Sequence, residues 1–455
     1  MTRFVSARGA LLTLMCVGMF LVQLDVTVVN VALVSIGDQL HSDTAGLQAI
    51  VAGYTVALAA VLLLGGSLTD RFGTRAMVLT GLIAFLITSL FAGAAPNLVV
   101  LVIARVLQGV AAAILLPSTL AVVNQTFVDK ADKARAIGIW AGVSALALPA
   151  GPLLGGILTE QGGWRWIFWI NVPIIAIALV GCARLLPRST GRESAPVNLT
   201  NMAALSAALT SLVAAAILTS PPWRIGAAVL AVIAIVFAVR LERTSSNPIV
   251  PAPLRTRAEF RTATVVSAVM NLVGIGMVFL LSLYLQTVRD RSPLAAGIEM
   301  LPLFVPLAVC APLTGRLAAR VGTYIPIVSG LAIGTAGCIV LSTVTSSSSY
   351  LLLAIGMAGL GLGMGLLTPS VVAMAMQSAP PELSGIASGI NNTARQAAGA
   401  VGVALFGTLV GSGRVPSEFD HGLRLCAIIS VVLWLGAIAF ATLNRTPTPA
   451  NTVAA

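Results

Sequence analysis

Charged side chains are scarce in this chain. Asp, Glu, Lys and Arg together make up 9% of its 455 residues, whereas 58% of the residues are hydrophobic. Soluble globular domains usually carry about 25% charged residues. The shortage excludes a soluble globule, and it indicates a chain built mainly of apolar segments that lie in a membrane.

Cysteine is also rare, and no two cysteines form a Cys-x-x-Cys pair. The five stand singly in or beside apolar runs, at Cys16, Cys182, Cys310, Cys338 and Cys426. This pattern excludes a disulfide framework and a thiolate metal site. It predicts buried, free thiols.

Signatures of catalysis are missing as well. The sequence has no nucleotide-binding loop, no cluster with metal-ligand spacing and no nucleophile–base arrangement, and its two histidines are His41 and His421. We therefore predict a protein that is not an enzyme, binds no metal and uses no cofactor. The net charge of +11 does not indicate a nucleic-acid partner, because the basic residues are scattered through short loops.

Long apolar runs are what the chain does have. Each holds about 20 residues, enough to cross roughly 30 Å of hydrocarbon, and the breaks between them carry Gly, Pro, Ser or charge. The sequence predicts an all-α integral membrane protein with about fourteen transmembrane helices. The candidate spans lie near residues 10–34, 47–68, 77–95, 98–123, 136–158, 166–186, 199–219, 225–241, 262–286, 295–317, 324–344, 350–376, 385–410 and 422–443.

The distribution of basic residues predicts the orientation. With the amino terminus in the cytoplasm, most Arg and Lys residues of the loops fall on the cytoplasmic side, as the positive-inside rule requires. Trp164, Trp166 and Trp169 then fit an aromatic belt at the outer surface. An even number of spans places both termini in the cytoplasm.

One short charged segment occurs twice. The segment GGSLTDRFGTRAMVLTGL, Gly65 to Leu82, returns in weaker form as TGRLAARVGTYIPIVSGL, Thr314 to Leu331. A second pair of segments, around Pro117 and Pro369, repeats at nearly the same offset. A charged hairpin that occurs twice between membrane spans is typical of a transporter built from two related halves.

The repeat divides the chain into three parts. We predict an N-terminal six-helix bundle in residues 1–188 and a pseudo-symmetric C-terminal six-helix bundle in residues 261–455. The linker between them, residues 189–260, supplies two extra central transmembrane helices and an interfacial segment on the inner membrane surface.

Two charged residues lie deep in the predicted N-terminal bundle. Asp25 stands about 15 residues into the first span, where an ionised carboxylate costs about 2.5–3.5 kcal/mol on insertion scales. Burial favours the protonated form of a carboxyl, so Asp25 is a candidate for proton coupling; a structural Asp beside Thr27 and Asn30 is the alternative. Arg105 reaches a similar depth from the outer side, so the two charges can interact; a purely structural arginine is the alternative.

Two further sites stand in the predicted C-terminal bundle. Glu299, near the start of the tenth span, is a second candidate for proton coupling or cation attraction, and an interfacial Glu that reaches water is the alternative. Arg395 falls near the membrane midplane in the most polar cluster of that bundle, which favours cavity lining over tight packing around a satisfied Arg. The candidate residues of a substrate cavity are Asn30, Tyr54, Trp140, Asn271, Asn391, Asn392 and Arg395.

The fifth span ends in ALALPAGPLLGGIL. Pro149 and Pro152 remove backbone donors, and Gly151, Gly155 and Gly156 remove side chains. The segment therefore predicts a kinked helix with a smooth face that packs closely against a neighbour.

Four of these segments together resemble signatures of the major facilitator superfamily, specifically its fourteen-span drug/proton antiporter family. The resemblance covers nearly the whole chain. The matching segments are Leu24 to Leu33 in span one, Gly66 to Arg75 after span two, Arg105 with Gln108 and Gly109 in span four, and Gly138 with Gly151 to Gly156 in span five. Departures from the family pattern occur at Val34, Thr69, Thr74 and Ala147.

The resemblance implies roles for these segments. Arg105 would take part in proton transfer, and Gly151, Pro152, Gly155 and Gly156 would form the antiporter motif. The loop after span two would hold a charge network that stabilises the outward-open state. Its gating residues are Gly66, Asp70, Arg71, Gly73 and Arg75.

The function that the resemblance implies is a proton-coupled antiporter of the bacterial cell membrane. It would export hydrophobic or cationic drugs and antibiotics from the cytoplasm by alternating access, with the proton gradient as energy source. Its partners would be a small-molecule substrate, protons and the lipid bilayer, and the chain would work as a monomer. Two alternatives remain: a dedicated exporter of one endogenous metabolite, antibiotic or amino acid, and a non-transporting membrane sensor.

Overall fold

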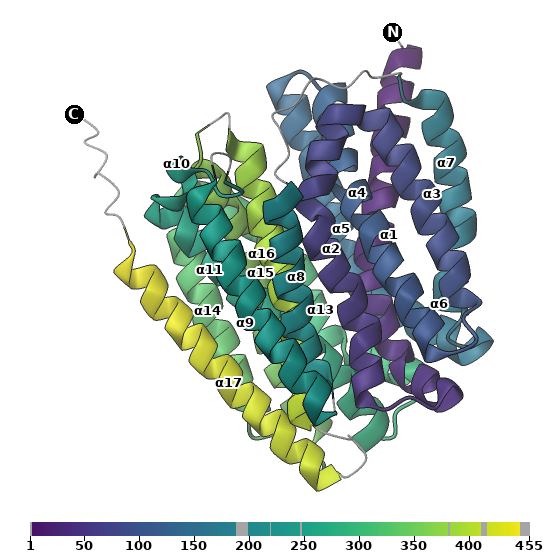
Figure 1. Cartoon of the computed structure of the whole chain (residues 1–455), viewed down its shortest axis with the longest axis vertical. Helices are drawn as coiled ribbons and strands as arrows, with labels where there is room; N and C mark the ends of the chain where they lie inside the picture. The colour runs from purple at the N-terminus through teal and green to yellow at the C-terminus, as the bar shows by residue number, and fades with distance from the viewer. Residues whose placement is uncertain are drawn as a thin grey trace.

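The computed structural model describes residues 2–187, 199–218, 220–245, 248–380, 383–410 and 416–445. Within these ranges every regular element is helical, and long helices stand side by side in two groups (Figure 1). The predicted all-α class is confirmed. The predicted boundary between residues 188 and 189 lies outside the described residues.

The N-terminal group is formed by the first seven helices. They are α1 (Thr2–Leu40), α2 (Thr44–Phe72), α3 (Thr74–Gly93), α4 (Leu98–Thr126), α5 (Lys130–Gly162), α6 (Trp166–Trp169) and α7 (Asn171–Leu185). Side-chain caps fix where two of them begin: Asp43 accepts from the backbone N–H of Gly46 before α2, and Asn97 accepts from that of Val100 before α4.

Three helices of the central segment and the C-terminal group follow. The central helices are α8 (Leu199–Ile217), α9 (Pro221–Thr244) and the short α10 (Ala252–Arg255). The C-terminal group comprises α11 (Ala258–Leu283), the π-helical turn η1 (Tyr284–Val288), α12 (Pro293–Glu299), α13 (Leu301–Val321), α14 (Tyr324–Leu341), α15 (Tyr350–Gln377), α16 (Ser384–Val410) and α17 (Pro416–Leu443).

Thirteen spans in the described ranges are long and apolar enough to cross a membrane. The helix α16 is not one of these thirteen, because residues 391–396 form a polar run within its 27 residues. It packs against α2, α8, α11, α15 and α17, which encloses it in the bundle. The protein is therefore a multi-pass membrane protein whose long helices agree with the predicted number of about fourteen.

The helices define two ends of the molecule. The basic face is the end where α1 begins and α2, α7 and α13 end, and it carries Arg71, Arg75, Arg184 and Arg320. The tryptophan face is the opposite end, where α1 ends and Trp164, Trp166 and Trp169 lie. In Figure 1 the basic face is at the top, beside the N-terminus.

The two groups repeat the same packing. The contacts α1–α5, α2–α4, α3–α4 and α3–α7 of the first bundle correspond to α11–α16, α13–α15, α14–α15 and α14–α17 of the second. The turns that join α2 to α3 and α13 to α14 both contain a glycine with positive φ, 86° at Gly73 and 80° at Gly322. Only glycine adopts this conformation without strain, so the two glycines of the sequence repeat serve the same turn.

The bundles share a hydrophobic core at the tryptophan face. One cluster of buried residues runs through the C-terminal bundle and includes Val29, Leu33 and Ile50 from the first bundle. A second cluster contains Met15, Val78 and other buried residues nearer the basic face, and its buried members all come from the first bundle. Among the described residues, α1, α2 and α5 all meet the second bundle towards the tryptophan face. Within these same ranges, only the α2–α16 contact continues towards the basic face, through Ala59 and Leu63.

The two central helices cover the seam between the bundles. The helix α8 packs on both α2 and α16, and α9 packs on α8, as Figure 1 shows at its centre. Large apolar side chains of α9 such as Trp223, Ile225 and Phe237 are exposed on the protein surface. In a membrane protein such a surface faces lipid.

Candidate functional site

A buried ion pair lies within the N-terminal bundle. Asp25 on α1 and Arg105 on α4 are each 1% exposed, and Nη1 of Arg105 pairs with Oδ2 of Asp25. The two residues predicted from sequence to reach the same depth are thus in direct contact. Nε of Arg105 also donates to the backbone oxygen of Ile50 on α2, at 3.4 Å. Each charge offsets part of the desolvation cost of the other.

Neutral polar side chains complete the hydrogen bonding around this pair. Oε1 of Gln108 accepts from Arg105 at 2.7 Å, and Nε2 of Gln108 donates to Asp25 at 3.3 Å and to Ser89 at 3.0 Å. The same Ser89 hydroxyl accepts from Asn171 at 3.4 Å. The network joins α1, α2, α3, α4 and α7. Sequence analysis missed Ser89 and Asn171, for which a lone polar residue in an apolar span was the only signal.

Aromatic rings hold the guanidinium in place. The Cζ atom of Arg105 lies 4.3 Å from the ring centroid of Tyr54 and 5.8 Å from that of Phe168, which adds cation–π attraction. The Tyr54 hydroxyl donates to the backbone oxygen of Val22 at 3.1 Å. A Cβ on Gly109 would collide with the backbone oxygen of Tyr54, so this glycine lets α4 approach α2. Tyr54 therefore lies inside the first bundle, against Arg105.

A second polar cluster joins α11 and α16 in the C-terminal bundle. Asn391 donates to the Ser267 hydroxyl at 2.9 Å and to the backbone oxygen of Ala263 at 3.3 Å. Asn271, one turn after Ser267 on α11, is also buried, whereas Asn392 is partly buried. Of these predicted cavity residues, the structure brings Asn391 and Asn271 to the α11–α16 contact.

Two predicted cavity residues have buried polar atoms without a partner. Nε of Arg395 makes no hydrogen bond with any residue that the structure describes, and the same holds for Nε1 of Trp140 on α5. Trp140 belongs to the core cluster of the first bundle. Arg395 is on α16, in the second bundle.

The glycines of α5 make close contact with α1. A Cβ added at Gly151 would collide with the Thr27 hydroxyl, and one at Gly155 would lie 2.7 Å from the backbone oxygen of Val28. Real Cβ atoms do not approach other atoms so closely. The predicted smooth helix face is therefore present, and it packs on α1 within about one turn of Asp25.

The same helix also contacts the other bundle through α12. A Cβ at Gly156 would lie 2.6 Å from Cα of Leu294 and 2.8 Å from the backbone oxygen of Pro293. In the reverse direction, a Cβ at Gly297 would collide with the backbone oxygen of Pro152. The antiporter-motif residues thus form part of the seal between bundles at the tryptophan face.

Direct hydrogen bonds cross between the bundles at the same end. Gln48 on α2 donates to the backbone oxygens of Val403 and Ala404 on α16, at 3.2 and 2.8 Å. Ser282 on α11 donates to the backbone oxygen of Asn30 at 2.8 Å. Asn30, a predicted cavity residue, is therefore part of the contact between α1 and α11.

Glu160 on α5 forms a further bridge between the bundles. Its Oε2 accepts from the Ser292 hydroxyl at 3.1 Å and from the backbone N–H of Leu294 at 3.3 Å. Neither Glu160 nor Gln48 was singled out from the sequence. Both lie near helix ends, where a polar residue is ordinary and carries no signal of its partner.

Glu299 lies at the C-terminal end of α12 rather than inside a long span. Its Oε1 is 2.8 Å from Nε of Arg291, and its backbone oxygen accepts from the Tyr350 hydroxyl at 3.1 Å. The structure therefore places it about one short helix away from Glu160, at the tryptophan face. It is not in contact with Asp25 or Arg105.

The gating-loop residues lie together at the basic face. Asp70 and Arg71 are exposed at the end of α2, and Asp70 makes no ion pair with a described residue. Arg75 donates to the backbone oxygens of Ala183, at 2.7 Å, and Leu186 at the end of α7. A cation at a helix C-terminus satisfies its free carbonyl groups. A Cβ on Gly66 would meet nothing within 4 Å, so Gly66 faces open space.

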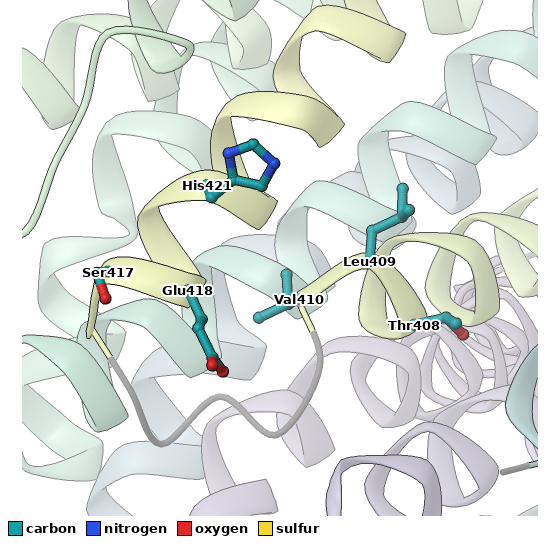
Figure 2. A pocket seen from close by; sticks show the side chains of 6 residues that line it. All are labelled: Thr408, Leu409, Val410, Ser417, Glu418 and His421. Atoms are coloured by element: carbon teal, nitrogen blue, oxygen red, sulfur yellow. The ribbon is translucent and has the colours of Figure 1, made fainter.

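A surface pocket lies elsewhere, between the end of α16 and the start of α17. Figure 2 shows its lining, with the Glu418 carboxylate and the His421 ring projecting from α17. It holds none of the predicted site residues. Its lining residues are Thr408, Leu409, Val410, Ser417, Glu418 and His421.

Comparison with known proteins places this arrangement in a family. The sequence-family model of the Major Facilitator Superfamily matches residues 15–403 of this chain. A methylenomycin A resistance protein of Bacillus subtilis (strain 168) is 33% identical over 89% of this chain and 88% of that protein. A puromycin resistance protein of Streptomyces alboniger is 34% identical, over 92% of this chain and 86% of its own length.

The chain is also similar to a protein named for export and, in its fold, to a solved transporter structure. A tetracenomycin C resistance and export protein of Streptomyces glaucescens is 33% identical over 87% of this chain and 74% of that protein. Among solved structures, the peptide transporter POT in complex with sulfate superposes with a TM-score of 0.72 at 17% identity, over 96% of this chain and 94% of that one. At that identity the likeness concerns the fold alone.

Proposed function

The chain belongs to the major facilitator superfamily, and on that premise we propose that it is a proton-coupled antiporter that exports antibiotic-like small molecules. The relatives named for antibiotic resistance or export support the exporter part of this proposal. Proton coupling is argued from the site in the first bundle. We place the protein in the bacterial cell membrane, working as a monomer, because one chain carries both bundles.

The observation that carries the proposal is the Asp25–Arg105 pair. Among the described residues, Asp25 is the only carboxyl more than about one helical turn from the end of its helix. A proton that reaches Asp25 neutralises the carboxylate, whereas Arg105 keeps its charge at any physiological pH. Protonation therefore breaks the ion pair and leaves Arg105 with Gln108, the two aromatic rings and the backbone oxygens of Ile50 and Asp25.

Helix α1 connects this proton site to the seal between the bundles. Thr27 and Val28 touch the glycines of α5, and the backbone oxygen of Asn30 accepts from α11. All three residues follow Asp25 within five positions on the same helix. Loss of the ion pair weakens the attachment of α1 to α4, and the contacts that close the tryptophan face depend on the position of α1. This supplies a physical link between protonation and alternating access.

The proposed cycle assigns a state and an orientation to the structure. With the basic face in the cytoplasm, we assign the shared core at the tryptophan face to a closed outer side and the described state to one that opens inward. Asp70 makes no ion pair with a residue that the structure describes, in keeping with a gating charge that finds its partner when the basic face closes. A membrane potential supplies about 2.3 kcal/mol per charge per 100 mV, enough to drive modest accumulation.

Efflux from cells tests this function. Cells that express the protein should accumulate less of a set of fluorescent antibiotics than cells with an Asp25→Asn variant at equal expression, and an uncoupler should abolish the difference. Reduced accumulation of one compound alone would indicate the dedicated exporter. Equal accumulation of every compound, with or without the protein, would contradict transport and favour the membrane sensor.

A further inference from the structure

Arg395 is a charged residue in the middle of a membrane helix. It stands 11 positions after Ser384 and 15 before Val410, the two ends of α16. Placing a guanidinium at this depth is costly unless it reaches water or a partner. The side chain is only partly exposed, and its Nε atom is buried.

The neighbours one turn away show which way Arg395 faces. Asn391 contacts Ser267 on α11 through two hydrogen bonds. A Cβ on Gly399 would lie 3.8 Å from the backbone oxygen of Asn271, which is also on α11. Residues spaced by four share one face of a helix, so Arg395 lies on the α11 face of α16. This face is inside the bundle and not towards lipid.

Within the described part of the chain, no anion neutralises Arg395. The ion pairs found there are Arg105 with Asp25 and Arg291 with Glu299. Both carboxylate oxygens of Asp25 are already used, by Arg105 and Gln108. The two deep arginines therefore differ in kind: one is paired, and the other carries an uncompensated positive charge.

The position of the Arg395 guanidinium indicates that it binds a ligand rather than stabilises the fold. A structural arginine is expected to have its donors satisfied, as those of Arg105 are, because an unpaired buried donor destabilises the fold. The surroundings supply both a polar and an apolar contact surface. Asn271 and Asn392 offer further donors, while Ile275 of α11 is apolar and partly exposed. Guanidinium groups bind carboxylates through two parallel hydrogen bonds.

We propose that Arg395 forms a substrate-binding subsite for the carboxylate, or a similar anionic oxygen group, of an otherwise apolar molecule. This inference rests on the proposed export function and names the substrate class. It replaces the cationic class that the sequence led us to expect, because the described membrane interior holds an unpaired positive charge and no unpaired carboxylate. A cationic substrate would be repelled there.

Direct binding to the purified protein tests this subsite. The probes are aromatic monocarboxylates of increasing size, from 2-naphthoate upward, each paired with its neutral methyl ester, and the readout is calorimetric affinity. The variants are Arg395→Gln and Arg395→Lys, with Arg424→Gln, an exposed arginine on α17, as matched control. Gel filtration and circular dichroism show whether each variant is folded.

We expect at least one carboxylate to bind about tenfold more tightly than its ester, the usual size of one charge-assisted hydrogen bond. Arg395→Gln should remove this preference, Arg395→Lys should retain part of it, and the control should match the unaltered protein. The proposal is overturned if no carboxylate of the series binds, if acid and ester bind equally, or if Arg395→Gln leaves the preference unchanged.

Transport in vesicles separates this inference from the proposed function. If Arg395-dependent binding of carboxylates is found but no substrate moves on a pH gradient, the export function fails and the subsite stands. If pH-driven transport of a neutral compound is found and acids are not preferred, the subsite fails and the export function stands.

Discussion

Replacing Gly156 by alanine should destabilise the state described here. A Cβ at this position would lie 2.6 Å from Cα of Leu294 and 2.8 Å from the backbone oxygen of Pro293. All the nearest atoms belong to the backbone, which cannot rotate aside as a flexible side chain can. The methyl group must therefore push α5 away from α12 and weaken the seal at the tryptophan face.

The general cost of overpacking sets the expected size of this destabilisation. Overpacking of a close contact costs about 1–3 kcal/mol. Since about 1.4 kcal/mol corresponds to a factor of ten, the sealed state should lose roughly 5- to 150-fold in relative population. The gain in helix propensity from Gly to Ala acts in every conformation and does not affect this ratio. Gly142→Ala, on the same helix but with nothing within 4 Å of the new Cβ, is the matched control.

Disulfide cross-linking between α5 and the start of α12 measures the population of the sealed state. Cysteines at Glu160 and Ser292, whose side chains are 3.1 Å apart, are introduced after the native cysteines have been replaced. Gly156→Ala should lower the ratio of sealed to open molecules by about fivefold or more, which appears as a smaller cross-linked fraction at early times, and Gly142→Ala should leave that fraction unchanged. Equal cross-linking in both variants would refute the close-contact argument, and so would an equal loss in both.

Three further outcomes are expected. Asp70→Asn should slow transport several-fold at unchanged membrane insertion, as measured by initial efflux rates at equal expression; an unchanged rate would contradict the gating role. Arg105→Met should destabilise the protein by about 3–5 kcal/mol, because it leaves Asp25 buried and unpaired, and the double variant Asp25→Leu/Arg105→Met should recover most of this in thermal unfolding. A cysteine at Ser220 should react with an impermeant reagent added to intact cells and one at Ser245 should not; the reverse pattern would overturn the proposed orientation.

Much of the fold was predictable from the long apolar runs and from the internal repeat of the sequence. The length of each apolar run predicted the helices, and the recurrence of Gly73 at Gly322 indicated two related loops. The structure adds that both glycines have positive φ. The depth of Asp25 and Arg105 could be counted along their spans, which brought the pair to the same level. Direct contact between them required the packing of α1 against α4, which counting along one helix does not supply.

The contacts between bundles could not be predicted in the same way. Glu160 and Gln48 bridge α5 to α12 and α2 to α16. Three of their four partners are backbone groups, which leave no pattern in the sequence, and the fourth is the Ser292 hydroxyl. Arg395 posed a different difficulty. Its polar neighbours were visible in the sequence, but the absence of a counter-ion among the described residues is a property of the packed structure.

The most direct test of proton-coupled export is uphill transport by purified protein in lipid vesicles. An imposed pH gradient should drive substrate to a higher concentration in the compartment that corresponds to the cell exterior. Collapse of the gradient should abolish this accumulation. The Asp25→Asn variant should still bind substrate and allow it to equilibrate, but it should not accumulate it. If Asp25→Asn accumulates substrate on the pH gradient as the unaltered protein does, Asp25 is not the coupling carboxyl and the account is wrong.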